Sequence, residues 1–229
     1  MHAGAARAGI GLLASASLAA VLTGFGSSGS PAPPLSPAAT VAQMKTAVNA
    51  ASSVHLDGVL HDGGRTVALD IGLVRSGGFA GTIAGNDVPL TLIDAGGKVY
   101  VKATPAFLRE LRVSSAVCSL MCGKYVELTS AQTSALAGDF TMRTLLGSLT
   151  GALPRLADAG TTTVNGQHAR VLRASDGSTL DVAATGSPYP LRVIGKAHRG
   201  RLDFSQWNSV PRPVAPPASQ VINVSQLGG

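Results

Sequence analysis

Residues 180–207, LDVAATGSPYPLRVIGKAHRGRLDFSQW, have the pattern of three short strands joined by tight turns. Apolar and polar residues alternate along 180–183, 191–193 and 202–205, and glycine or proline residues separate these runs. Alternation with a period of two, bounded by Gly and Pro, is typical of antiparallel strands with one apolar face. The segment therefore predicts a sheet whose apolar face must be covered by another part of the chain or by a ligand.

The chain before this segment extends the same pattern. One block predicts five strands, along residues 54–60, 66–75, 79–83, 88–93 and 98–102, and a later block predicts strands along 161–164 and 169–174. A helix is expected over 37–51, and leucine-rich helices with hardly any charge are expected between the two blocks. A sheet this wide curls as its twist accumulates. The sequence therefore predicts an α+β fold, a strongly curved antiparallel half-barrel of about ten strands with helices covering its concave face.

Composition narrows the class of function. Hydrophobic residues make up 45% of the 229 residues and charged residues only 13%, which excludes a disordered chain. The net charge of +6 is spread as single Lys and Arg residues, without basic runs or interleaved aromatics. Nucleic acid is therefore not an expected partner, whereas an anionic membrane surface or wall polymer is compatible with this charge.

The N-terminus has the pattern of an export signal. Arg7 precedes an apolar stretch over residues 8–22, and a Gly/Ser/Pro-rich segment follows. A buried helix of the folded domain is the alternative interpretation of the stretch. Leu22-Thr23-Gly24-Phe25 resembles a bacterial lipobox, but Phe25 stands where the lipobox requires cysteine. Because phenylalanine has no thiol, a diacylglycerol thioether cannot form at this position.

The sequence offers few residues for catalysis or metal binding. Cys118 and Cys122 are the only cysteines, and in an exported chain we expect them to form a disulfide. The C-x₃-C spacing differs from the C-x-x-C of redox motifs, and the histidines lack the spacing of metal ligands. The sequence contains no nucleophile elbow, P-loop or H-E-x-x-H motif. We therefore expect no catalytic residue, no metal and no cofactor, and a hydrolase remains only a third hypothesis.

The predicted concave face is apolar but poor in bulky side chains. Aromatic residues make up only 4% of the chain, so many Ala, Gly and Val positions leave room inside the sheet. An apolar half-barrel roofed by helices is suited to hold acyl chains. The alternative is an interior filled by the protein's own side chains, as in a non-enzymatic interaction or sensor module of the cell envelope. The residues expected to line the face, two of them from the roofing helix, are Val67, Leu69, Ile71, Leu73, Leu90, Leu92, Val99, Val101, Leu145, Leu149, Val182, Leu191, Val193, Leu202 and Phe204.

Short motifs along the chain resemble a known family. They are the strand over 53–60, KVYVK at 98–102, GKYV at 123–126, VNG at 164–166 and the final DFSQW at 203–207. In order and spacing they resemble the LprG/LppX-type lipoproteins of actinobacteria, a group similar to the LolA and LolB carriers. The resemblance implies a half-barrel that carries lipids or lipoglycans across the cell envelope.

The resemblance also sets the expected organisation of the chain. We expect a signal peptide with a degenerate lipobox over residues 1–25, a tether over 26–37, an LprG/LolA-like lipid-binding domain over 38–210 and a proline-rich tail over 211–229. The protein is expected to be an exported monomer. Its expected location is the outer face of the cell membrane or the extracellular envelope, with a lipid or lipoglycan and the membrane surface as partners.

Overall fold

The computed structural model describes residues 35–62, 64–85, 88–110, 112, 114–139, 141–151 and 155–223. Leu35–Gly229 form one compact unit. The expected signal peptide and lipobox, together with most of the tether, lie outside the described residues.

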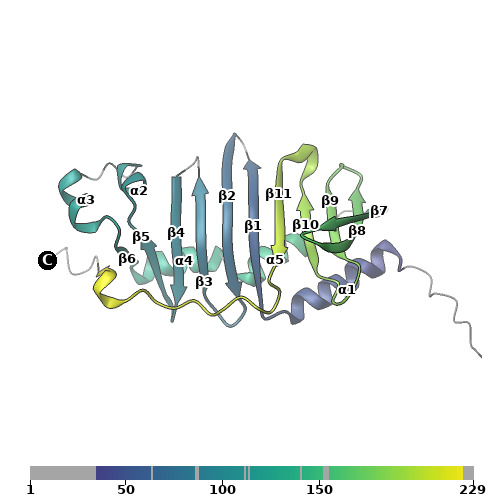
Figure 1. Ribbon diagram of the computed structural model, residues 1–229, viewed down its shortest axis with the longest axis horizontal. Coiled ribbons are helices and arrows are strands. Elements are labelled where there is room, and N and C mark those ends of the chain that lie inside the picture. The colour runs from purple at the N-terminus through teal and green to yellow at the C-terminus, as the bar shows by residue number, and fades with distance from the viewer. Residues whose placement is uncertain are drawn as a thin grey trace, which may run out of the picture. The chain divides into compact units, whose positions relative to one another are not determined.

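The described strands form one twelve-stranded sheet (Figure 1). Their order across the sheet is β12-β6-β5-β4-β3-β2-β1-β11-β10-β9-β8-β7, and the two end strands are not paired with each other, so the sheet is not closed. The strands are β1 (Ser53–Asp62), β2 (Arg65–Val74), β3 (Phe79–Gly85), β4 (Val88–Ala95), β5 (Lys98–Lys102), β6 (Tyr125–Glu127), β7 (Leu156–Val164), β8 (Gln167–Ala174), β9 (Thr179–Ala183), β10 (Pro190–Ile194), β11 (Gly200–Ser205) and β12 (Val221–Asn223).

Two antiparallel halves meet at the pair β1–β11. In this pair His55 lies opposite Ser205 and Leu56 lies opposite Phe204. Tight turns connect the strands within each half, as at Asn165-Gly166, where both residues have positive φ angles of 48° and 80°. Such a turn matches the twist of the strands that flank it. The predicted curved half-barrel is confirmed, with one addition: β12 pairs with β6 in the parallel sense, so the sheet is mixed.

The helices are α1 (Pro37–Ala50), α2 (Pro105–Glu110), α3 (Ser115–Met121), α4 (Ser130–Asp139) and α5 (Met142–Gly151), and short 3₁₀ turns lie at Lys196–His198 and Ala218–Gln220. α4 and α5 lie behind the sheet in Figure 1. The Oγ of Ser36 accepts a hydrogen bond from the backbone N–H of Ala39 at 3.2 Å and so caps α1. At the other end of α1, the Arg75 side chain donates to the carbonyl oxygens of Val48, at 2.7 Å, and Ala51.

One face of the sheet, here called the core face, carries the hydrophobic core. Alternate residues of the strands point to this face, and α1 and α5 pack against it. Arg170 of β8 helps to hold α1 in place, because it donates to Thr40 Oγ1 at 2.7 Å and pairs with Asp158. The buried residues of the cluster are Met44, Val48, Ala51, Val54, Leu56, Ile71, Leu73, Phe79, Leu92, Val99, Val101, Met142, Leu146, Leu172, Leu180, Val182 and Phe204.

The opposite face, here called the outer face, is crossed by the C-terminal segment. The backbone N–H of Val210 donates to Ser53 Oγ at 3.0 Å, and Val210 lies so close to Gly72 that a Cβ there would be 2.7 Å from Val210 Cγ1. The segment runs in front of the strands in Figure 1 and ends in β12. The expected tail over 211–229 therefore contributes an edge strand to the same sheet.

Candidate functional site

Most of the residues expected to line a cavity lie on the core face. Ile71, Leu73, Leu92, Val99, Val101, Val182 and Phe204 are buried in the main cluster, and Leu90, Val193 and Leu202 are partly buried against it. Val67 and Leu69 share this face, because they alternate with Ile71 and Leu73 on β2. Leu145 and Leu149 belong to α5, but their side chains lie outside the described part of the chain.

Leu191 is the exception, and its placement on the concave face was wrong. It packs in a separate small cluster with Val164 and Ala169, against Ala183. The cause is a β-bulge, since the register between β10 and β9 shifts between Pro190 and Arg192. A bulge breaks the strict alternation on which the prediction relied.

The sequence interpretation also missed several buried residues of the core face. Met142 and Leu146, four residues apart, are the described α5 side chains in the cluster, whereas Leu145 and Leu149 were chosen. The missed strand residues are Val54, Leu56, Phe79, Leu172 and Leu180. All five are apolar residues within strands. Aligning each strand with its neighbour would have placed them on the same face as the predicted residues.

Asp94 is an ionisable group on this apolar face. It lies opposite Phe79 of β3 and Val99 of β5, and both of these side chains are buried in the core. Burial raises the pKa of the Asp94 carboxyl. Beside it lies a cavity of about 380 Å³ that is also lined by Arg75, Thr141, Met142 and Arg143. The edge of the core face near the start of α5 therefore combines apolar walls with charged and hydroxyl groups.

Known proteins of similar structure identify the type of fold. No family model and no curated protein matches the sequence. Among solved structures, LprF from Mycobacterium bovis has a TM-score of 0.53 at 13% identity, covering 78% of this chain and 96% of LprF. Lipoprotein LppX from Mycobacterium tuberculosis has a TM-score of 0.50 at 19% identity, covering 77% of this chain and 99% of LppX. The chain has the LppX/LprF-type lipoprotein fold.

The outer face of this LppX/LprF-type fold carries a charged network. Asp203 lies between two arginines: Arg192 Nε donates to its Oδ1 at 2.6 Å, and Arg201 Nε donates to the same oxygen at 3.0 Å. Burial by itself would raise the pKa of Asp203, but the hydrogen bonds from Arg201 and Arg192 lower that pKa to about 2. The carboxylate therefore stays ionised and ties β10 to β11.

A Ser–His–Asp contact also lies on the outer face. Ser205 Oγ is 3.4 Å from His55 Nδ1, and His55 Nε2 is 2.8 Å from Asp70 Oδ1. The first distance is at the limit of a hydrogen bond, and the Asp70 side chain is 67% exposed. A nucleophile needs a close base and a buried orienting group, so we interpret the contact as a cross-strand polar network of the LppX/LprF-type sheet.

Three further features are the disulfide, metal sites and membrane-spanning helices. Cys118 and Cys122 form a disulfide at the end of α3, as predicted. Within the described residues, no group of three or more His, Cys, Asp or Glu side chains is placed to hold a metal ion. No described helix of this LppX/LprF-type unit has the length and apolar character needed to span a bilayer.

Proposed function

We propose that this protein binds lipid acyl chains between its core face and the helices that cover it, and carries lipid within the cell envelope without covalent chemistry. The observation that carries the proposal is the wide apolar face of the sheet. The core face is apolar across most of a twelve-stranded open sheet. Among the described side chains, α5 adds only Met142 and Leu146 to the cluster. In this proposal α5 separates from the sheet to admit a chain.

Typical burial free energies favour replacing the contacts of α5 with those of an acyl chain. Exposing Met142 and Leu146 costs about 2 kcal/mol each, by the usual free energy of burying such side chains. A fatty acyl chain of about sixteen carbons gains roughly 10 kcal/mol gross when it is buried, at about 0.8 kcal/mol per CH₂. This gross gain is larger than the cost of exposing these two side chains. In this proposal, binding of the acyl chain therefore drives the separation of α5 from the sheet.

The cavity beside Asp94 suits the polar end of such a ligand. Arg75 and Arg143 line it with Asp94 and Thr141, next to the buried Phe79 and Met142. A head group with hydroxyl or phosphate oxygens finds hydrogen-bond donors and an acceptor there while its chain follows the apolar face.

The proposal places the protein outside the cell membrane. The apolar stretch over residues 8–22 supports export, and Phe25 excludes a thioether anchor at the degenerate lipobox. The likeness in fold to LprF and to lipoprotein LppX is consistent with a role in the cell envelope. Transport between membrane layers is the function that a soluble acyl-chain container performs there.

A pair of β4 variants tests acyl-chain binding. Leu90 lies on the core face, its neighbour Thr91 lies on the outer face, and both are partly buried. We expect Leu90→Trp to fill space on the core face and to weaken binding of a polyene fatty acid whose fluorescence rises in apolar surroundings. Thr91→Trp is the matched control and should bind as the wild type does. Equal binding by both variants, or no binding by the wild type, would contradict the proposal.

The second candidate is a non-enzymatic interaction module with a filled interior. The observation that favours it is the burial of Ile71, Leu73 and Val99, which are fully covered by the protein itself. This module would show no saturable fatty-acid binding, and Leu90→Trp would then affect only stability.

A further inference from the structure

Helix α3 presents apolar side chains outward. It contains no buried residue, Leu120 is 70% exposed and Val117 is 39% exposed. Residues three apart lie on the same side of a helix, so these two side chains form one small apolar surface. A helix that packs against a core buries such residues. Here they are left in contact with solvent.

The position of α3 is fixed by its connections. The backbone N–H of Gly123 donates to the Ala103 carbonyl at 2.8 Å, and the N–H of Ala103 donates to the Lys124 carbonyl at 2.9 Å. The disulfide between Cys118 and Cys122 closes the last turn of the helix. The hydrogen bonds therefore hold the end of α3 beside the end of β5, and the disulfide fixes its last turn.

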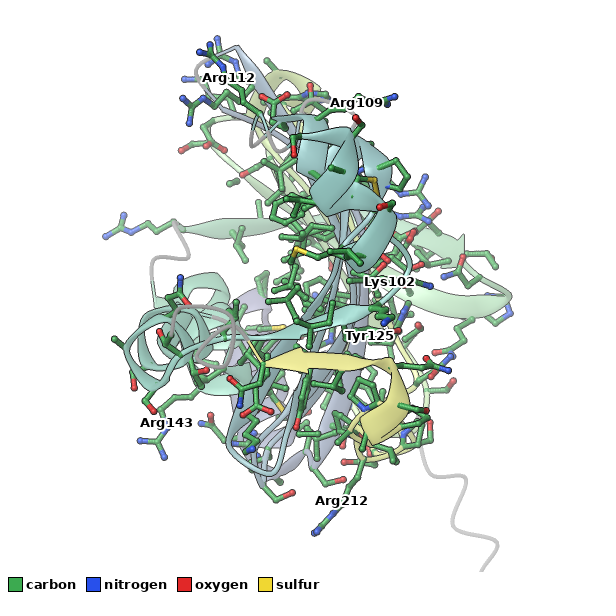
Figure 2. The ribbon with its side chains drawn as sticks, turned by 90° about the vertical axis from the view of Figure 1, so that its left-hand side faces the viewer. Lys102, Arg109, Arg112, Tyr125, Arg143 and Arg212 are labelled. Carbon is green, nitrogen blue, oxygen red and sulfur yellow. A yellow bond between two sulfur atoms is a disulfide. The ribbon has the colours of Figure 1, made fainter. Side chains whose placement is uncertain are left out.

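Basic residues precede and follow α3 in the chain. Arg109, Arg112 and Lys124 are exposed, and no ion pair involves any of them in the described part of the chain. Glu110 is the only acidic residue between Lys102 and Tyr125. Figure 2 shows Arg109 and Arg112 extending away from the sheet near the α2–α3 segment. The segment therefore combines an exposed leucine on α3 with exposed basic residues that precede and follow the helix in the chain.

We propose that α3, with Arg109, Arg112 and Lys124, is a docking surface for an anionic lipid bilayer. Leu120 projects from a short helix, so it is poorly suited to fill a groove on a protein partner. It can instead insert at the boundary between lipid head groups and acyl chains. The basic side chains meet the negative surface, and each strengthens binding by about fivefold. The docking surface is separate from the core face, so it stands whether or not that face holds lipid.

Site-specific fluorescence of the full chain tests the surface. Leu120→Trp places a reporter on α3, and Val214→Trp is the matched control, because Val214 is 79% exposed on the C-terminal segment. The apolar N-terminal stretch is common to both variants, and Trp207 gives both the same background. With phosphatidylglycerol vesicles we expect a blue shift, and quenching by brominated acyl chains, for Leu120→Trp alone. No shift at position 120, an equal shift at position 214, or an equal shift with phosphatidylcholine vesicles would overturn the proposal.

Charge removal tests the electrostatic part. In the Leu120→Trp background, Arg109→Gln with Arg112→Gln should raise the lipid concentration needed for the shift by about 25-fold, which is the fivefold factor for each of two charges. The control pair Arg155→Gln and Arg173→Gln removes the same charge from exposed positions elsewhere. Equal weakening by the two pairs would overturn the assignment of the surface to α3.

Discussion

Asp203 shows how one buried carboxylate can set the acid stability of this protein. Its pKa lies at about 2 because the hydrogen bonds from Arg201 and Arg192 outweigh burial. A carboxyl whose folded-state pKa is depressed stabilises the fold above its ordinary pKa of 3.8, and that contribution is lost as pH falls from about 4 toward 2.

We predict that Asp203→Asn lowers the free energy of unfolding at pH 7 by about 1–3 kcal/mol, because Arg192 and Arg201 lose their charged partner. The difference between wild type and variant should shrink as pH falls from 4 to 2. Urea denaturation at several pH values measures it. A difference that is constant with pH would show that Asp203 does not titrate as described.

Asp94 is expected to have the opposite pH dependence. Burial raises its pKa, so the folded state binds the proton more tightly than the unfolded state does. The charged form therefore costs stability once pH rises above the ordinary value, and Asp94→Asn should be more stable than the wild type at pH 7 but not at pH 3. Asp70→Asn serves as the control, since Asp70 lies on the outer face and is 67% exposed. Equal effects of the two substitutions would contradict the placement of Asp94.

At the scale of elements, the C-terminal segment can pack closely against β2 because Gly72 has no side chain. A Cβ there would lie 2.7 Å from Val210 Cγ1, whereas a Cβ at Gly85 of the neighbouring strand would meet nothing within 4 Å. We predict that Gly72→Ala costs about 1–3 kcal/mol through overpacking and that Val210→Ala, combined with it, recovers much of the loss. Gly85→Ala should be nearly neutral in the same thermal unfolding assay. A neutral Gly72→Ala would show that the segment does not lie across β2.

The disulfide is expected to act locally. Because α3 has no buried residue, Cys118→Ser with Cys122→Ser should loosen α3 while the sheet keeps its stability. Hydrogen exchange should then accelerate in residues 114–124 and stay unchanged in β1 and β2. Faster exchange throughout the sheet would mean that α3 supports the core.

The elements differ in how far the sequence alone predicts them. Strict alternation was enough to predict β2, and the helix expected over 37–51 matches α1, because both patterns are local. α3 was missed because a short helix with no buried face has no apolar periodicity. Leu191 was assigned to the wrong face because a bulge is not visible in the alternation. Leu145 and Leu149 stay predictions, because their side chains lie outside the described part of the chain.

At the scale of the whole molecule, the decisive contact joins β1 to β11. Leu56 and Phe204 are paired across 148 residues of sequence, and this pairing makes one sheet of two halves. Local patterns cannot choose a partner so far away, although they predicted that one curved sheet was a possible arrangement. The same pairing makes the apolar face continuous from β5 to β8, which is the surface that the proposed lipid would follow.

The central claim is that this continuous face holds acyl chains in the cell. Native mass spectrometry of the protein purified from its own host, without detergent, tests the claim most directly. The account predicts a mass above that of the polypeptide, which falls to the polypeptide mass after organic extraction and releases a lipid with fatty acyl chains. A single mass equal to that of the bare polypeptide would contradict it.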